Sequence, residues 1–172
     1  VYLYDHFGSL SANNLLDKIR SLAKGCDVGW IVLDHLSIAV SGLENGSDGR
    51  ALDERKAIDV LMTQLRSLVE ETGIGMILVS HLRRPEGNKG FEEGIATSLN
   101  ALRGSASIAQ LSDSVIGLER NQQSEDEANQ VTVRVLKNRF TGETGVASTL
   151  YFNKDTGRLS EHEFETDEFD EY

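Results

Sequence analysis

An apolar run that ends on a carboxylate constrains the fold of this chain more than any other feature. The run WIVL at residues 30–33 is followed directly by Asp34. Continuous hydrophobicity of this kind is typical of a strand buried on both faces of a parallel sheet. In open α/β sheets, ligands bind at the carboxyl ends of such strands. The run also fits an ordinary core strand followed by a helix-capping aspartate, so by itself it leaves both interpretations open.

A second apolar run with a polar end favours the ligand-binding interpretation. The run GMILVS at residues 75–80 is predicted as another central strand, and His81 follows it directly. Between the two runs, apolar residues at helical spacing predict a long amphipathic helix over Leu52–Thr72. A strand–helix–strand order is typical of parallel neighbours, whose carboxyl ends share one edge. We therefore expect Asp34 and His81 to lie side by side; side chains far apart or on opposite sides would contradict this hypothesis.

The remaining pattern predicts an α/β fold. Helices are predicted over residues 11–24 and 106–111, and residues 140–145 have the character of a hairpin turn. Further strands are predicted at residues 1–4, 113–119, 131–139 and 146–153. Helices separate the early strands, whereas the last strands follow one another directly. We therefore expect a mainly parallel sheet with an antiparallel edge hairpin.

Length and cysteine content set broad limits. The 172 residues fit a single domain with a substantial core, and the one cysteine, Cys26, excludes an internal disulfide. No apolar stretch reaches the roughly 18 to 20 residues of a membrane helix, so no membrane is expected as a partner. The chain begins within a predicted strand and without methionine. We expect it to be a piece of a longer cytoplasmic protein.

The net charge of −11 is concentrated at the C-terminus. Residues 160–172 hold seven of the 28 acidic side chains and no lysine or arginine. The other 21 acidic residues face 17 basic ones, so the body is close to neutral, and bulk charge neither suggests nor excludes nucleic-acid binding. We expect the acidic segment to be a disordered tail. Its three aromatic residues fit an interaction tail, although a merely solubilising end fits the composition equally well.

Six segments, taken in order, resemble the replicative ring helicases of the RecA-like, DnaB-like superfamily. They are YDHFGS, WIVLDH, DERKAIDVLMTQLRSL, ILVSHLRRPEGNKGFEEG, LRGSASIAQLSDSVIGLERNQQ and LKNRFTGETG. The similarity is greatest to the helicase domain of the primase-helicases of short-tailed phages, relatives of the mitochondrial replicative helicase. The resemblance implies the C-terminal portion of a RecA-like P-loop ATPase core over residues 1–159, with residues 160–172 as its tail. It also implies the cytoplasm of a phage-infected bacterium as the location.

The resemblance implies that three residues bind ATP (or dTTP) with Mg²⁺. Asp34 resembles the Walker B carboxylate, which would make it the metal residue and a catalytic one. His81 resembles the sensor of the γ-phosphate, a second catalytic residue, although an isolated histidine after a strand is usually a loop residue. Gln110 resembles a polar switch that contacts the nucleotide; a lone glutamine there also fits an ordinary surface position.

Two further residues resemble contacts made at the boundary between subunits of a ring, and a third resembles a contact to the nucleotide base. Arg139 resembles the arginine finger, which would stabilise charge on the γ-phosphate held by the neighbouring subunit. Lys137 lies two residues earlier on the predicted strand and would add a second cation on the same face. Phe152 matches a position where the family stacks an aromatic ring on the nucleotide base. A solvated strand face fits the two cations, and a core position fits Phe152, so these alternatives stay open.

Basic residues in one glycine-containing loop are candidates for binding single-stranded DNA. Arg83, Arg84 and Lys89 are suited to contacting phosphates without reading sequence. Arg103, at the start of a short predicted helix, offers another phosphate contact. The loops at residues 37–50 and 121–129 are further candidates, although the second is acidic.

The activity that the resemblance implies belongs to a longer protein. No segment reads G-x-x-x-x-G-K-[ST], so the Walker A lysine is absent from this chain, as is the family's catalytic glutamate. We expect the parent protein to be a hexameric ring helicase that couples nucleoside triphosphate hydrolysis to 5′→3′ translocation and unwinding, and the piece alone to be inactive. We also expect its acidic tail to bind the replicative DNA polymerase. Two alternatives are a RecA-like recombinase and a non-catalytic assembly module with the same fold.

Overall fold

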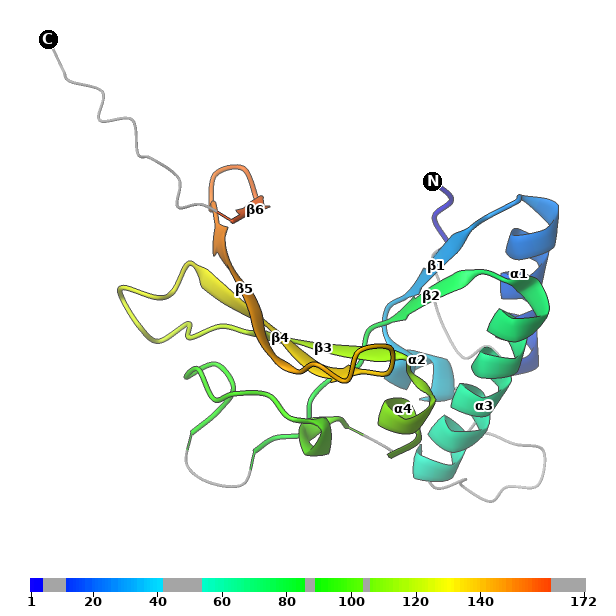
Figure 1. Cartoon of the computed structure of the whole chain (residues 1–172). Coiled ribbons are helices and arrows are strands. Elements are labelled where there is room, and N and C mark those ends of the chain that lie inside the picture. Colours follow the sequence, from blue (N-terminus) through cyan, green and yellow to red (C-terminus); the bar gives the residue numbers. More distant parts are fainter. Residues whose placement is uncertain (5–11, 42–53, 86–88, 104–105, 162–172) are drawn as a thin grey trace, which may run out of the picture. The chain divides into compact units, whose positions relative to one another are not determined.

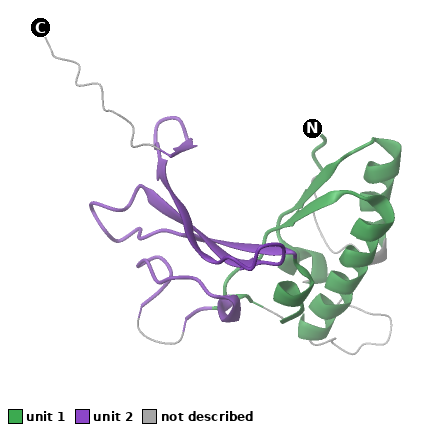
Figure 2. Cartoon of the chain, in the orientation of Figure 1, with its two compact units in different colours: residues 1–83, 102–112 green, residues 84–101, 113–172 purple. Residues whose placement is uncertain are grey.

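The computed structural model describes residues 1–4, 12–41, 54–85, 89–103 and 106–161. These residues form two compact units, which are coloured separately in Figure 2. The first unit contains residues 1–83 and 102–112, and the second contains residues 84–101 and 113–172. Figure 1 shows the elements in chain order: the first unit is mainly helical with a parallel strand pair, and the second is mainly antiparallel strands.

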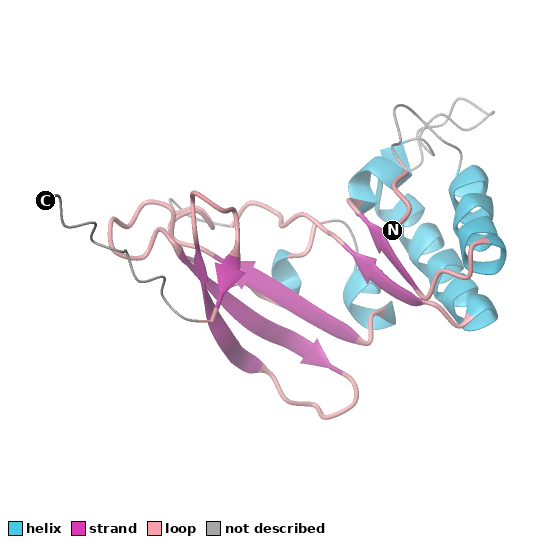
Figure 3. Ribbon diagram, turned by 90° about the horizontal axis from the view of Figure 1, so that it is seen from above, coloured by secondary structure: helices cyan, strands magenta, loops and turns pink. Residues whose placement is uncertain are grey.

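The first unit is a strand pair packed on helices. Its elements are α1 (Ala12–Gly25), β1 (Trp30–Leu33), α2 (Leu36–Ser41), α3 (Glu54–Thr72), β2 (Gly75–Leu78) and α4 (Ala106–Leu111). Strands β1 and β2 run parallel, with Trp30 opposite Gly75 and Leu33 opposite Leu78 (Figure 3). Helices α2 and α3 form the connection between them, as the strand–helix–strand pattern predicts.

Helices cover one face of this strand pair. Successive side chains of a strand point to opposite faces, and those that pack on the helical core are Ile31, Leu33, Met76 and Leu78. On the other face, Trp30 and Val32 are 68% and 63% exposed. The prediction of two neighbouring parallel strands is confirmed, but burial on both faces is not seen among the described residues.

Helix α3 is the centre of the hydrophobic core. Its buried side chains recur every three or four residues along one face: Ala57, Ile58, Leu61, Met62, Leu65 and Leu68. Helices α1, α2 and α4 pack against it. The helix ends at Thr72 as predicted, whereas its predicted first residues, 52 and 53, lie outside the described part of the chain. The helical spacing of the apolar residues in the sequence is thus the spacing of the buried residues of α3.

The second unit is an antiparallel sheet with the strand order β3-β4-β5-β6. Its strands are β3 (Ser114–Glu119), β4 (Gln130–Asn138), β5 (Gly145–Phe152) and β6 (Leu159–Ser160), and it also holds the short helix η1 (Leu99–Ala101). The predicted hairpin is the β4–β5 pair. Antiparallel pairing is more extensive than an edge hairpin, because β3 pairs with β4 and β6 pairs with β5.

The remaining expectations concern residues 1–4, membrane-spanning helices and the C-terminal tail. Residues 1–4 were predicted as a strand, but they form no strand in the structure and their side chains are exposed. No helix within the described ranges is both long and apolar enough to cross a membrane. Of the predicted tail, only residues 160 and 161 are described. Ser160 belongs to strand β6 and pairs with Tyr151 of β5, so the predicted start of the tail at residue 160 is wrong. Residues 162–172 lie outside the described part.

Candidate active site

The strand ends of the first unit bring Asp34 and His81 to one edge. The N–H of Val79 donates to the carbonyl of Leu33 (3.0 Å), and the N–H of Leu36 donates to the carbonyl of Val79 (2.9 Å). These bonds extend the parallel register beyond β1 and β2, so Asp34 lies beside Val79 and His81 follows shortly after. Both Asp34 and His81 are exposed. The two strand ends are neighbours, as predicted. That the side chains of Asp34 and His81 lie side by side stays a prediction, as do their roles.

His35, a residue for which the sequence predicted no role, makes the contact between the two strand ends. Its ring centroid lies 4.1 Å from that of His81, and the ring planes are tilted by 36°. The Nδ1 atom of His35 is buried and has no hydrogen-bond partner in the described structure. The peptide bond between Asp34 and His35 is cis. The sequence could have indicated this contact only by position, because His35 and His81 each lie shortly after the end of one of two neighbouring parallel strands.

Arg103 lies next to the same edge. Its N–H donates to the carbonyl of His81 (3.0 Å), and the adjacent Leu102 forms an antiparallel bridge with Leu82. The Arg103 side chain is 3.7 Å from the carboxylate of Glu54 at the start of α3. The structure therefore places this predicted phosphate contact beside the candidate γ-phosphate sensor, where the Glu54 carboxylate already neutralises part of its charge.

Two other candidates of the first unit are exposed at its surface. Gln110 lies on α4, and Arg83 follows His81 closely in the chain. The predicted DNA-binding loop at residues 37–50 begins within helix α2 (Leu36–Ser41), and its remaining residues lie outside the described part of the chain. The first unit thus contains Asp34, His81, Gln110, Arg83 and Arg103, with the first two at a shared strand edge.

The candidate arginine finger lies just beyond β4, at the start of a tight turn. The side-chain oxygen of Asn138 accepts hydrogen bonds from the N–H groups of Phe140 and Thr141 at 3.0 and 3.3 Å. An asparagine that bonds the backbone ahead of it in this way nucleates a turn. The turn leaves Arg139 exposed, with its guanidinium 3.0 Å from the carboxylate of Asp113. Lys137 lies two residues earlier, in β4 opposite Val115.

Phe152 lies at the end of β5 and contacts an arginine that the sequence did not predict as a site residue. The guanidinium carbon of Arg120 is 5.3 Å from the centre of the Phe152 ring, within the range of a cation–π contact. The Nε of Arg120 donates to the carbonyl of Ala128 (2.6 Å), and the N–H of Phe152 donates to the carbonyl of Asn129 (2.7 Å). The side chain of Arg120 is thus held by a hydrogen bond to the backbone of the loop that follows it.

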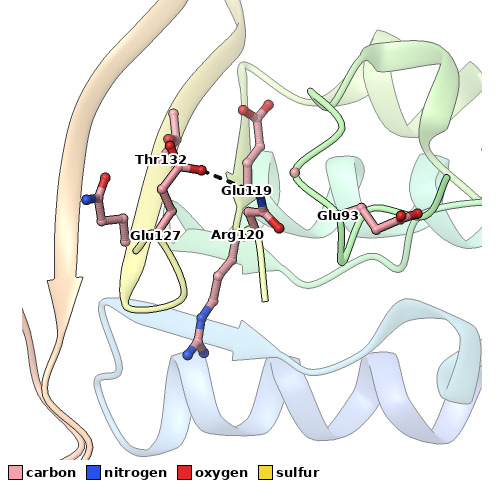
Figure 4. A pocket seen from close by; sticks show the side chains of 8 residues that line it. Glu93, Glu119, Arg120, Glu127 and Thr132 are labelled. Atoms are coloured by element: carbon pink, nitrogen blue, oxygen red, sulfur yellow. Dashed lines mark hydrogen bonds between the residues drawn. The ribbon is translucent and has the colours of Figure 1, made fainter. Parts of the chain in front are cut away.

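An open pocket of about 170 Å³ lies at the end of β3. Figure 4 shows Glu93, Glu119, Arg120, Glu127 and Thr132 around it. Burial raises the pKa of Glu119, but hydrogen bonds from Arg134 and Thr97 outweigh this effect and hold the pKa below its ordinary value. Glu119 is therefore ionised at neutral pH and fully engaged in hydrogen bonds.

The other predicted DNA contacts of the second unit, Arg84 and Lys89, are exposed. The acidic loop at residues 121–129 is held by its own side chains, since Ser124 accepts a hydrogen bond from the N–H of Glu127 (3.1 Å). Within the described ranges, no group of three or more histidine, cysteine, aspartate or glutamate side chains could hold a metal ion. A magnesium ion bound through one carboxylate, water and phosphate oxygens needs no such group.

Comparisons with known proteins point to one family. Residues 1–161 match the model of the DnaB-like helicase C-terminal domain. The chain is 47% identical over 158 residues to the DNA helicase/primase of Enterobacteria phage T3, a match that covers 92% of this chain and 27% of that protein. It is 26% identical over 152 residues to a probable plasmid replicative DNA helicase of Chlamydia psittaci, covering 88% of this chain and 31% of the relative. The chain thus spans less than a third of either relative.

The fold agrees with this assignment. A solved structure of a DnaB-like replicative helicase, described with its interactions with primase, superposes with a TM-score of 0.65 at 22% identity, covering 89% of this chain and 35% of that one. The likeness confirms the predicted RecA-like fold class. Since the family model spans nearly the whole chain and the phage relative shares almost half of the aligned residues, this chain belongs to the DnaB-like helicase C-terminal domain family.

Proposed function

We propose that this chain is part of the ATPase core of a replicative ring helicase, which couples hydrolysis of ATP or dTTP to 5′→3′ movement on single-stranded DNA. The observation that carries the proposal is the shared edge of β1 and β2, where Asp34 and His81 follow neighbouring parallel strands. This is the edge at which open α/β sheets bind ligands. Family membership favours a helicase over a recombinase or a non-catalytic module.

Asp34 is the residue that fits the magnesium ion of such a site. Its carboxylate is exposed at the strand end, and Mg²⁺ is commonly held by one or two carboxylates together with substrate phosphates and water. The ion would neutralise charge on the phosphates during transfer. His81 would contact the γ-phosphate, oriented by the ring of His35, and Gln110 would respond to the nucleotide from α4.

Arg139 acts on a nucleotide held by a neighbouring subunit in this proposal. It precedes the tight turn between β4 and β5, and its side chain is 47% exposed. A guanidinium in that place can reach outward and stabilise charge on the transferring phosphoryl group, with Lys137 as a second cation. A ring, as expected a hexamer, supplies such a neighbour at every subunit boundary.

Phe152 and Arg120 together form the candidate contact for the nucleotide base. Their cation–π contact fixes the aromatic ring at the end of β5. Stacking on an aromatic ring and an arginine tolerates different bases, which suits a site that accepts either ATP or dTTP. Arg83, Arg84, Lys89 and Arg103 are the candidate contacts to DNA phosphates.

Hydrolysis by the full-length protein tests the proposal. Magnesium-dependent hydrolysis of ATP or dTTP, stimulated by single-stranded DNA, is expected for the wild type. D34N should lower the turnover by about a thousandfold or more, because the metal loses its carboxylate. D155N, in an exposed turn of the second unit, is the matched control and should keep the wild-type rate. Full turnover in D34N would contradict the assignment of the site.

A mixing experiment tests whether Arg139 acts on the neighbouring subunit. D34N and R139A are each expected to be inactive as uniform rings. In mixed rings, some boundaries bring the intact Asp34 of one subunit to the intact Arg139 of the next. Hydrolysis should therefore reappear on mixing, with a maximum near equal amounts. Mixtures that stay inactive while gel filtration shows mixed rings would contradict action between subunits.

The acidic C-terminal segment is the proposed contact to the replicative DNA polymerase, in the cytoplasm of a phage-infected bacterium. Its negative charge and aromatic residues are the support for this proposal. Ser160 belongs to β6, so a deletion of residues 162–172 removes the acidic segment without removing a strand. Polymerase binding should be lost in this deletion while hydrolysis is retained. Unchanged polymerase binding would remove the tail from the proposal.

A further inference from the structure

Thr97 joins a loop to a strand through buried polar contacts. Among the residues that the structure describes, it is the one buried polar residue, at 6% exposure. Its N–H and its hydroxyl both donate to Glu119 Oε1, at 2.6 and 2.8 Å. Glu119 also accepts two hydrogen bonds from Arg134 of β4, at 2.7 and 3.1 Å. Hydrogen bonds to a charged group are stronger than those between neutral groups and hold their partners in place.

Gly117 provides the space that this contact needs. It lies on β3, two residues before Glu119 and therefore on the same face of the strand. A Cβ atom at Gly117 would lie 2.1 Å from the hydroxyl oxygen of Thr97 and 3.0 Å from its Cβ. Any larger residue at this position would push Thr97 away from the carboxylate.

The same loop is fastened to the chain after β3 at a second place. The N–H of Gln122 donates to the carbonyl of Glu92 (2.8 Å), and Glu93 forms an isolated antiparallel bridge with Asn121. Gly94 has a φ of 81°, and an added Cβ there would lie 3.1 Å from the Cβ of Asn121. We refer to residues 89–98 as the anchored loop, because these two contacts hold it to residues 119–122.

Arg120 lies between the two anchors and points away from them. In Figure 4 the side chains of Glu119, the last residue of β3, and of Arg120, which follows the strand, point in opposite directions. On its own side, Arg120 contacts Phe152. The anchor of the loop, at the last residue of β3, and the candidate base contact, at the residue that follows it, are therefore consecutive in the chain.

We propose that Thr97 and Glu119 are positioning residues, which transmit the engagement of single-stranded DNA at the anchored loop to the candidate base contact next to the end of β3. The inference rests on the proposed function, since it takes Lys89 in this loop as a contact to DNA. A loop held by a buried carboxylate cannot shift towards DNA without moving Glu119. Because Arg120 is the next residue, its guanidinium shifts with the strand end and changes its contact to the base.

Thr97 variants of the full-length protein test this coupling. T97V keeps the shape of the side chain and the backbone hydrogen bond but removes the hydroxyl, whereas T97S keeps the hydroxyl. For T97V we expect the stimulation of hydrolysis by single-stranded DNA to fall by about threefold or more, with hydrolysis in the absence of DNA unchanged. T97S should retain the stimulation. E119Q, which removes the charge at the centre of the contact, should reduce the stimulation at least as much as T97V.

Hydrogen exchange gives a readout that does not depend on hydrolysis. At saturating single-stranded DNA, the amides of residues 119–122 should gain protection in the wild type and in T97S but not in T97V. Equal stimulation and equal protection in T97V and the wild type would overturn the coupling, even with the helicase function intact. A wild-type protein without DNA-stimulated hydrolysis would overturn the proposed function instead. A thermal midpoint of T97V close to that of T97S shows that both variants are folded.

Discussion

Asp113 holds Arg139 by two hydrogen bonds that come from different parts of the arginine. The N–H of Arg139 donates to the carbonyl of Asp113 (2.9 Å), and its Nη1 donates to Asp113 Oδ1 (3.0 Å). Asp113 directly precedes β3 and Arg139 directly follows β4, so the contact closes one end of this strand pair. The ion pair is half exposed. It keeps the candidate finger near its own subunit.

Breaking this ion pair is expected to raise hydrolysis slightly. In D113N the backbone hydrogen bond remains. The guanidinium, however, no longer has to break an ion pair with a carboxylate before it reaches the nucleotide of the neighbouring subunit. Exposed ion pairs contribute about 0 to 1 kcal/mol, so DNA-stimulated turnover should rise by at most about fivefold. R139A, in contrast, should lower the turnover by about a thousandfold or more. Initial rates at saturating nucleotide measure both effects; a loss in D113N as large as that in R139A would show that Asp113 orients the finger instead of competing for it.

Removing the ring of Phe152 is expected to weaken nucleotide binding more than catalysis. F152A loses the surface on which a base can stack, and the contact to Arg120. Aromatic stacking contributes about 1 to 3 kcal/mol per base, so the KM for ATP should rise by about 5- to 150-fold while kcat changes little. F152Y keeps an aromatic ring and is the matched control. A KM unchanged in F152A would assign Phe152 to the core of the second unit.

The strand ends could be predicted because their signal is local. An apolar run that stops on Asp34, and another that stops before His81, are each contiguous in the sequence. One helix between the runs is enough to predict parallel pairing. The core face of α3 could be predicted for the same reason, since its spacing lies within one helix. The sequence therefore correctly predicted the elements whose hydrophobic period and whose ends can both be read within a short stretch of residues.

The contacts that fix the second unit could not be predicted because they join residues distant in sequence. Thr97 and Glu119 are ordinary surface residue types, and nothing near either of them indicates a buried pair. Arg120 meets Phe152 only after β5 has paired with β4. Strand β6 is two residues long, too short to give any alternation. Predicting these contacts requires the register of the whole antiparallel sheet.

Truncating the centre of α3 is expected to destabilise the domain strongly. Leu61 is 0% exposed and packs at the middle of the helical core, whereas Val60, its neighbour on the same helix, is 54% exposed. Leucine-to-alanine changes in cores cost about 2 to 5 kcal/mol, so L61A should lower the thermal unfolding midpoint by several degrees. V60A, the matched control, should leave the midpoint almost unchanged. Equal effects in the two variants would contradict the assigned core face.

The contact between α1 and α3 is expected to weaken in acid. Hydrogen bonds from Lys24 and Arg20 lower the pKa of Glu71 to about 2. The pKa of Glu71 in the folded state lies below its unfolded value of about 4.3. The stabilisation by Glu71 is therefore fully present above about pH 4.3 and is lost as the pH falls towards about 2.

E71Q should therefore lower the unfolding midpoint at neutral pH and flatten its decline between about pH 4 and pH 2, because the glutamine carries no charge to lose. Glu70 pairs with Arg66 on α3 itself and joins no second helix, so E70Q is the matched control. Thermal unfolding followed by circular dichroism across this pH range measures the difference. If the unfolding midpoints of the wild type and of E71Q declined equally steeply with falling pH, Glu71 would not link the two helices in solution.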